Sequence, residues 1–334
     1  METNTLTGLI YILMAGSLSG TFAIPFKFNV KWKWENNWAI WSLFALLILP
    51  WVAAITTVPH LSTILHESIH VVGMVALFGL IWGVGAILFG KGIHYLGVSL
   101  SMPIMLGLIN SVGTIMPMLY KDPSSLVSPE GIQLLIATSI IIVGIIIISI
   151  AGSQKDRQTQ DASKKKSNHF VKGLVICILA GIFGPMINFA FVFGEPMQLS
   201  AIQQGATSVY ASNVIWCVTL TCGFLINFGY CVYILRKNKS HVLYKNVDWK
   251  YWLFASLTGI IWYGSIMFYG MGGNMLGSMG ASIGWAVMQS LAIITSNLSG
   301  IIAGEWKGSS KQSIVIMSTG MLFLIVGIIT IASI

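Results

Sequence analysis

Charged residues are the scarcest class in this sequence. They make up 8% of the 334 residues, whereas soluble globular proteins carry roughly a quarter. Hydrophobic residues make up 55%, and apolar stretches long enough to cross a bilayer, about 18 residues or more, recur from end to end. This composition excludes an ordinary soluble domain and predicts a protein embedded in a membrane.

Cysteine is also sparse, and no motif of a soluble enzyme lies in the setting that its chemistry needs. The four cysteines lie in apolar segments without the paired spacing of a zinc or redox site. The sequence contains no complete P-loop. An H-E-x-x-H occurs at 66–70, but it crosses the start of the predicted span 69–91, and a G-x-S-x-G at 280–284 lies inside the predicted span 277–303. We therefore expect reduced, buried thiols, no metal, no cofactor and no catalytic residues, so the protein is not expected to be an enzyme.

Alternating polarity, the pattern of membrane-spanning strands, is missing as well. The run 139–150 is almost continuously apolar, and lipid leaves helices as the other way to satisfy the backbone. We expect an all-α polytopic membrane protein with ten transmembrane helices. The predicted spans are 7–27, 36–57, 69–91, 97–119, 131–152, 171–193, 209–235, 250–271, 277–303 and 312–333.

An internal repeat organises these spans. Eight of the 21 aligned positions of 77–97 and 257–277 are identical. Gly8 and Gly16 in the first span recur as Gly173 and Gly181 in the sixth. Each copy holds five spans, an odd number, so the second copy must be inverted in the membrane. The predicted domains are a first five-helix repeat (1–152), a polar cytoplasmic linker (153–169) and a second repeat (170–334).

The basic residues predict the orientation. Of the 18 Lys and Arg residues, all but Lys121 lie in odd-numbered loops or next to them. Because cytoplasmic loops are enriched in Lys and Arg, these loops are expected in the cytoplasm and both termini outside. The net charge of +8 is spread over several loops rather than one patch, so no nucleic-acid partner is expected.

Polar side chains inside the spans are candidates for substrate contacts. Asn110 lies in the fourth span, and Gln289 lies in the corresponding span of the second half. Asn188 follows Gly184-Pro185 in the sixth span. These amides are predicted to hydrogen-bond a polyol in a cavity near the membrane midplane. The alternative is that they join neighbouring helices.

Several aromatic residues are further candidates. Trp82 and Trp262 occupy matching repeat positions inside their spans, and Tyr263 follows directly. Aromatic rings stack on the apolar C–H faces of sugars, and the indole N–H donates a hydrogen bond. The alternative is packing against glycines of neighbouring helices; Trp216 and Trp285 are weaker candidates. Aromatic residues near span ends are expected to anchor at the membrane interface: Trp32, Trp34, Trp38, Trp41, Trp249, Tyr251 and Trp252.

Charged groups that could couple an ion are few. Lys27 follows Pro25 at the inner end of the first span, His94 flanks the third, and Glu305 closes the ninth. Histidine titrates in a useful range, but such flanking groups also extend to the interface without further function. No acid lies in the middle of a predicted span, which limits any proton relay argued from the sequence.

Several blocks of the sequence occur in order along almost the whole chain: 22–27, 31–38, 49–51, 78–83, 95–97 and Glu305-Trp306. Together they resemble the bacterial L-rhamnose–proton symporter family of the drug/metabolite transporter superfamily. The resemblance implies ten helices in two inverted repeats and proton-driven uptake of L-rhamnose across the inner membrane. The matched positions are Pro25, Lys27, Trp34, Glu35, Trp82, Tyr95, Trp262, Tyr263 and Glu305. Glu35 thereby joins Lys27, His94 and Glu305 as a candidate for ion coupling or gating.

Our first hypothesis is therefore a symporter that imports L-rhamnose or a similar sugar with protons, or with sodium, by alternating access. A second hypothesis is an exporter of cationic drugs or metabolites with the same fold. Such a site favours a buried acid, and none lies in mid-span. A third is a membrane-embedded sensor or channel without coupled transport. An integral membrane enzyme is disfavoured because the sequence shows no constellation of nucleophile, metal ligands or acid–base groups.

Overall fold

The computed structural model describes residues 5–159, 170–245, 247–277 and 280–334. Within these ranges the chain is helical and forms no β-strand. Among the described residues, ten helical segments are long and apolar enough to cross a membrane. The prediction of an all-α polytopic membrane protein with ten spans is confirmed.

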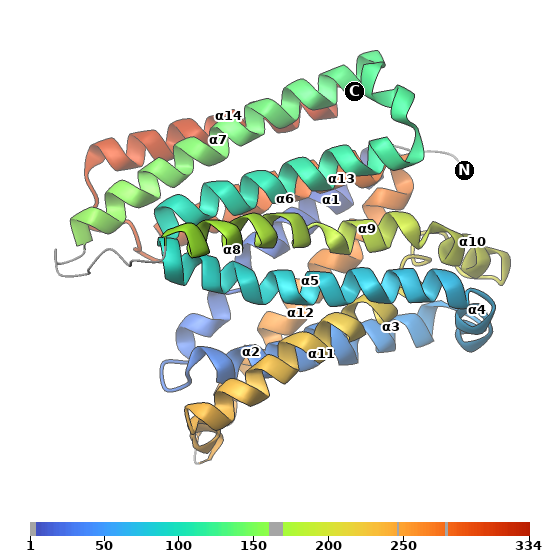
Figure 1. The fold of residues 1–334 in the computed structure, drawn as a ribbon, viewed down its shortest axis with the longest axis horizontal. Coiled ribbons are helices and arrows are strands. Elements are labelled where there is room, and N and C mark those ends of the chain that lie inside the picture. The colour runs from blue at the N-terminus through green and yellow to red at the C-terminus, as the bar shows by residue number, and fades with distance from the viewer. Residues whose placement is uncertain (1–4, 160–169, 246, 278–279) are drawn as a thin grey trace. The chain divides into compact units, whose positions relative to one another are not determined.

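The chain folds into two compact units (Figure 1). The first unit consists of Met1–Val84 and Met186–Ala281, and the second of Gly85–Pro185 and Ser282–Ile334. Each unit therefore contains residues from before and after the predicted linker. Helix α5 (Ile69–Leu96) belongs to the first unit up to Val84 and to the second from Gly85. Helix α13 (Gly280–Ile302) begins in the first unit and continues in the second from Ser282.

The remaining elements divide between the units as follows. The first contains α1 (Thr5–Thr21), the 3₁₀ helix η1 (Ile24–Phe28), α2 (Trp34–Ser42), the π-helix η2 (Leu43–Ile48), α3 (Leu49–Thr57), α4 (Leu61–Glu67), α9 (Met186–Phe193), α10 (Glu195–Gln203), α11 (Asn213–Lys237), the 3₁₀ helix η4 (Ser240–Tyr244) and α12 (Trp249–Met275). The second contains α6 (Val98–Lys121), the 3₁₀ helix η3 (Pro123–Val127), α7 (Pro129–Thr159), α8 (Phe170–Phe183) and α14 (Lys311–Ala332).

A proline reshapes the second span without ending it. Pro50 has no backbone N–H, and its ring crowds the carbonyl of the fourth preceding residue. The turn before it widens into η2, in which the Leu49 N–H donates to the Phe44 carbonyl five residues earlier. The widened turn removes the clash, as in other single-turn π segments. The span therefore continues through Pro50 as α3.

Three of the differences between the predicted spans and the structure have a clear physical reason. The first span leaves the α-helical conformation at Thr21 and continues as η1. The sixth breaks at Gly184-Pro185 into α8 and α9, because a proline within a helix removes a backbone donor. Helix α7 extends to Thr159, into the predicted linker, because polar residues still form helical hydrogen bonds outside an apolar setting. Residues 160–169 of that linker lie outside the described residues.

Matching positions of the sequence repeat make matching contacts. In the first unit, a Cβ built on Gly8 of α1 would lie 3.2 Å from Leu276 Cδ2 at the end of α12. In the second, a Cβ on Gly173 of α8 would lie 2.6 Å from Leu96 Cδ2 at the end of α5. Gly8 and Gly173 are repeat partners, as are Leu276 and Leu96. The front of each copy thus packs against the third span of the other copy.

Glycines end the repeated segment in the same backbone conformation. Gly97 follows α5 with φ +75°, and Gly277 follows α12 with φ +73°. Residues with a Cβ rarely adopt this positive φ, whereas glycine does so at little cost. The repeat therefore keeps glycine at the position where the chain leaves one span and turns into the next.

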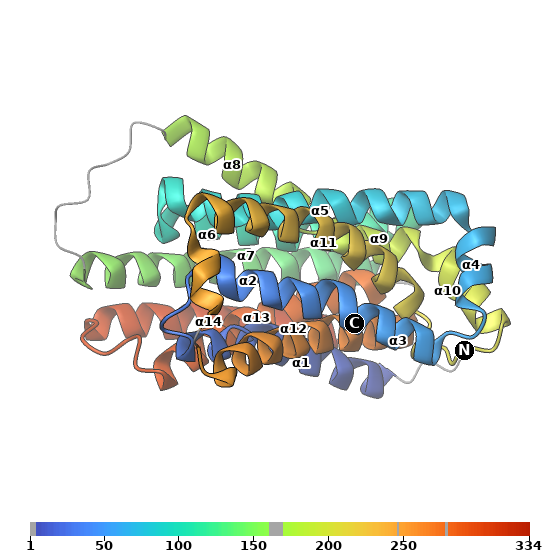
Figure 2. The same cartoon turned by 90° about the horizontal axis from the view of Figure 1, so that it is seen from below.

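Two long helices of the second unit pack along a glycine contact. Helices α7 and α14 lie side by side in both views (Figures 1 and 2). A Cβ on Gly144 would lie 2.9 Å from the Gly320 carbonyl oxygen, and one on Gly320 would lie 2.8 Å from that of Gly144. Small residues let membrane helices approach closely, so this pair holds α7 against α14.

Candidate functional site

A column of tryptophan rings crosses the interior of the first unit. Trp38 and Trp41 of α2 have ring centroids 4.2 Å apart, and Trp41 meets Trp262 of α12 edge-on at 5.2 Å. Trp82 of α5 then stacks on Trp262 at 5.6 Å with an interplanar angle of 26°. The interface prediction is wrong for Trp41, which is 1% exposed and forms the centre of this column.

The two repeat-matched tryptophans are therefore in direct contact. Trp82 also packs against Gly223 of α11, because a Cβ built on Gly223 would lie 2.6 Å from Trp82 Cζ3. Trp82 therefore packs on a glycine, as the alternative interpretation expects, and its contact with a sugar stays a prediction. Two matching residues of a repeat touch where the two copies meet, so the stack marks the junction of the copies within this unit.

Five buried donors of the first unit have no hydrogen-bond partner among the described residues. A buried polar group without a partner is costly, so such groups are usually paired with protein, water or a ligand. Other indoles nearby are paired: Trp38 Nε1 donates to Asn227 Oδ1 at 3.1 Å, and Trp51 Nε1 to Thr221 Oγ1 at 2.8 Å. The five unpartnered groups are Trp41 Nε1, Ser212 Oγ, Trp216 Nε1, Tyr263 Oη and Ser265 Oγ.

Asn188 lies in a buried hydrogen-bond network. Its Oδ1 accepts a hydrogen bond from the Tyr269 hydroxyl, and its Nδ2 donates to the Ala281 carbonyl at 3.3 Å. The Tyr269 hydroxyl also lies 3.2 Å from the same carbonyl. Asn188 thereby ties α9 to α12 and to the first turn of α13. In this conformation it holds Tyr269 in place, which favours the helix-joining interpretation for this amide.

Asn110 and Gln289 both belong to the second unit. Asn110 of α6 is buried; its Oδ1 lies 3.3 Å from Thr114 Oγ1, and its Nδ2 has no partner among the described residues. Trp285 of α13 donates from Nε1 to the Ile109 carbonyl at 3.0 Å and lies against Gly113, where a Cβ would be 2.7 Å from Trp285 Cε2. Gln289, one turn further along α13, is half-buried.

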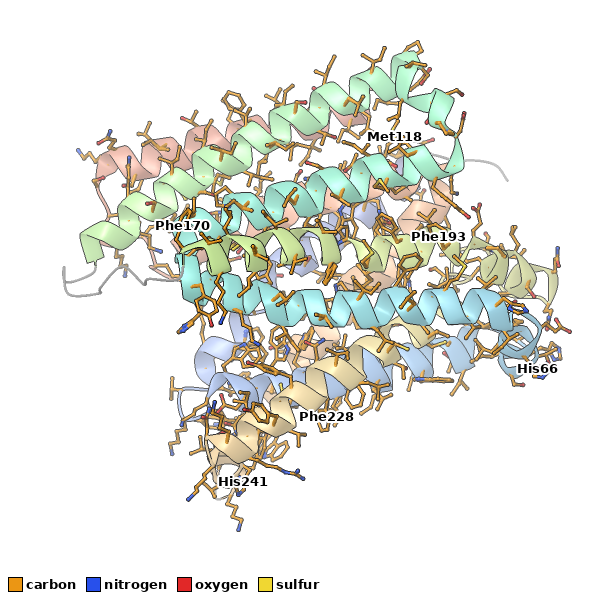
Figure 3. The ribbon with its side chains drawn as sticks, viewed as in Figure 1. His66, Met118, Phe170, Phe193, Phe228 and His241 are labelled. Atoms are coloured by element: carbon orange, nitrogen blue, oxygen red, sulfur yellow. The ribbon has the colours of Figure 1, made fainter. Side chains whose placement is uncertain are left out.

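Glu35 is the buried carboxylate among the four charged candidates. It is 5% exposed at the start of α2. Its Oε1 accepts hydrogen bonds from Ser240 Oγ at 2.6 Å and from Asn238 Nδ2 at 2.9 Å. Both donors come from the connection between α11 and α12, whose η4 turn carries His241 (Figure 3). The carboxylate therefore fastens α2 to that connection.

Neighbouring side chains strengthen this fastening. Asn36 Nδ2 donates to the Ser240 carbonyl at 2.9 Å, and the Tyr244 hydroxyl donates to the Asn36 carbonyl at 3.0 Å. Trp32 Nε1 donates to the Leu243 carbonyl at 3.1 Å, so this tryptophan is also buried rather than at the interface. Burial raises the pKa of Tyr244 well above its ordinary value, and nearby acidic groups add to the shift.

The other charged candidates lie at exposed positions. Lys27 is in η1, and His94 is in the last turn of α5 beside Tyr95. Glu305 follows α13, where a Cβ on Gly300 would lie 3.0 Å from its Oε2. No group of three or more His, Cys, Asp or Glu residues in the described part of the chain is placed to hold a metal ion.

The sequence identified part of this arrangement. It singled out Trp82, Trp262 and Tyr263, of which the first two meet in the structure. It assigned Trp41 to the interface, named Trp216 as a weaker candidate only, and missed Ser212 and Tyr269. Their only signal was a polar or aromatic residue inside an apolar span, which many helix-packing residues share.

Comparisons with known proteins cover the chain end to end. A family model described as L-rhamnose-proton symport protein (RhaT) matches residues 1–333. The L-rhamnose-proton symporter of Yersinia pestis (strain Pestoides F) is 28% identical over 339 residues, which is 97% of this chain and 96% of the relative. The L-rhamnose-proton symporter of Escherichia coli is 28% identical over 334 residues, with the same coverage of both chains. These relatives are named as transporters and not as enzymes. Because the family model spans nearly every residue, the chain belongs to the L-rhamnose-proton symport protein family.

Proposed function

We propose that this protein is a secondary active transporter that imports L-rhamnose together with protons by alternating access. The observation that carries the proposal is the family match over residues 1–333. In this mechanism, sugar and proton together favour the conformational switch more than either does alone, a coupling of about 1 to 3 kcal/mol.

The interior of the first unit supports a sugar as the substrate. A deoxyhexose has an apolar C–H face and several hydroxyl groups, which suit aromatic rings and unpartnered donors respectively. The stacked pair Trp82 and Trp262 supplies the rings, and the Tyr263 hydroxyl supplies a donor. In the proposal, these three residues contact the sugar.

The amides take different parts in the proposal. Asn110, whose Nδ2 has no partner among the described residues, and the half-buried Gln289 stay candidates for substrate contacts within the second unit. Asn188 has both ends of its amide engaged in the present conformation, so it acts by positioning Tyr269. In the proposal, those bonds are exchanged for bonds to the sugar when the protein changes conformation.

Glu35 is our choice for the proton-coupling residue. Two donated hydrogen bonds stabilise its carboxylate, and protonation would weaken both. A proton on Glu35 would thus loosen α2 from the connection between α11 and α12. Lys27, His94 and Glu305, at exposed positions, take secondary parts in gating or interfacial anchoring.

The proposal includes a location and an orientation. The protein lies in the bacterial inner membrane, with the odd-numbered loops in the cytoplasm and both termini in the periplasm. The support is that 17 of the 18 Lys and Arg residues lie in or beside the odd loops. The halves 1–152 and 170–334 are taken as inverted copies, supported by the matching Gly8–Leu276 and Gly173–Leu96 contacts.

Transport by the purified protein in proteoliposomes tests this function. An inward proton gradient should concentrate labelled L-rhamnose inside the vesicles, and a protonophore should abolish the accumulation. An inward sodium gradient at equal pH on both sides is the matched control for the coupling ion. Accumulation driven by the sodium gradient alone would identify sodium, rather than the proton, as the coupling ion. Failure of both gradients, with the protein folded, would refute the assignment.

A further inference from the structure

Two of the unpartnered donors of the first unit meet at one glycine. A Cβ on Gly270 of α12 would overlap Ser212 Oγ and would lie 2.7 Å from Trp216 Nε1. The hydroxyl and the indole N–H therefore face the same point of the α12 backbone. Neither has a hydrogen-bond partner among the described residues, and the two side chains are 1% and 0% exposed.

The surroundings fix the direction of the indole N–H. Phe191 of α9 stacks on Trp216 with centroids 5.5 Å apart and an interplanar angle of 9°. Tyr269, the neighbour of Gly270, packs on the other rings at 5.4 Å from Phe191 and 6.3 Å from Trp216. Tyr269 is itself held by Asn188. An indole in such a cage cannot turn to find a protein acceptor, so its donor is preorganised for something else.

The repeat shows that packing alone does not call for this arrangement. The partner of Gly270 in the first copy is Gly90. A Cβ on Gly90 would meet nothing within 4 Å, whereas one on Gly270 would meet both donors. The same glycine thus has an open setting in one copy and a polar one in the other.

The chemistry of the pair selects a neutral oxygen. An indole N–H donates only, and a serine hydroxyl donates and accepts. Neither group carries a charge. A sugar hydroxyl oxygen can accept from the indole while exchanging a hydrogen bond with serine. Gly270 lies eight residues beyond Trp262 on α12, about 12 Å of helical rise, so the pair is a separate position from the stacked tryptophans.

We propose that Ser212 and Trp216, facing Gly270, form a second sugar-binding position that holds one hydroxyl group of the transported sugar. This inference rests on the proposed function, because it takes its ligand to be the transported sugar. It adds a specificity determinant near the start of α11, away from Trp82 and Trp262.

Uptake of L-rhamnose and of its monodeoxy analogues, each lacking one ring hydroxyl, tests the proposal in proteoliposomes. In the unsubstituted protein, one analogue should show a KM about 3- to 10-fold above that of L-rhamnose, the effect of one lost hydrogen bond. In Ser212→Ala and in Trp216→Phe, that penalty should shrink to within about twofold, while the penalties for the other analogues persist. Gly270→Ala should resemble Ser212→Ala.

Gly90→Ala is the matched control and should keep the unsubstituted protein's pattern for every analogue. Thermal unfolding of each variant separates folding from binding, and Ser212→Ala removes only an oxygen atom if Trp216→Phe fails to fold. An unchanged pattern of KM values in Ser212→Ala, with L-rhamnose still accumulated, would overturn the second position alone and would mean that the pair holds a structural water. Failure of the unsubstituted protein to accumulate L-rhamnose would overturn the proposed function and this inference together.

Discussion

The contact between Gly79 and α11 gives the most direct test of the helix packing. A Cβ on Gly79 of α5 would overlap the Thr219 carbonyl oxygen and would lie 2.9 Å from its carbonyl carbon. Ordinary contacts between carbon atoms are about 3.5 to 4.0 Å. Gly79→Ala therefore requires α5 and α11 to separate by about 0.5 to 1 Å, against backbone atoms that have no rotamer to change.

The size of the effect follows from comparison with Gly73 of the same helix. A Cβ on Gly73 would meet nothing within 4 Å. Both substitutions gain the same helix propensity, about 1 kcal/mol, so the difference between them isolates the overlap. Overpacking of this kind costs about 1 to 3 kcal/mol. At about 2 °C per kcal/mol, Gly79→Ala should unfold about 2 to 6 °C below Gly73→Ala.

Thermal unfolding of the two purified variants in the same detergent measures this gap. Gly73→Ala should be at least as stable as the unsubstituted protein. Gly79→Ala should also lose uptake, since a wider spacing between α5 and α11 moves Trp82 away from Gly223. Equal Tm values for the two variants would refute the close packing of α5 on α11.

Three further outcomes are expected. Gly277→Ala places a Cβ at φ +73° and should destabilise the protein by about 1 to 3 kcal/mol in thermal unfolding. An unchanged Tm would contradict the requirement for glycine at this turn. Glu35→Gln keeps an acceptor for Ser240 but cannot exchange a proton at pH 7. It should retain sugar counterflow while losing accumulation driven by a proton gradient, and retained accumulation would remove Glu35 as the coupling residue. The pKa of Tyr244 is raised by burial, so its contribution to stability is complete below about pH 10 and is lost as the pH rises above that value. Tyr244→Phe should therefore show a smaller alkaline loss of stability than the unsubstituted protein, and identical pH profiles would contradict this.

Local patterns in the sequence were enough for much of the fold. Hydropathy gave the ten spans because the membrane selects long apolar helices, a property of consecutive residues. The repeat picked out Gly97 and Gly277, and both adopt a positive φ that the sequence alone does not report. Boundaries were less accurate where proline changes the backbone, as at Pro50 and Pro185.

The sequence was less informative about the candidate site. Glu35 came from the family resemblance, but its donors Ser240 and Asn238 lie about 200 positions away along the chain, as the separations of 205 and 203 residues show. Trp41 was assigned to the interface because it lies near a cluster of aromatic residues, yet its ring is buried against Trp262. Nothing in a single sequence distinguishes an aromatic residue at the interface from one that a distant helix covers.

The sequence by itself determined that this protein is a membrane protein with ten apolar spans and an internal repeat, and its blocks of matching residues identified the family. Those properties depend on composition, on hydropathy along one segment at a time and on identity between segments. Only the tertiary structure decided that Trp82 stacks on Trp262, that Glu35 fastens α2 to the connection after α11, and that Ser212 and Trp216 face Gly270. Each of these contacts joins helices far apart in the chain, and its geometry depends on how closely their small residues allow the backbones to approach.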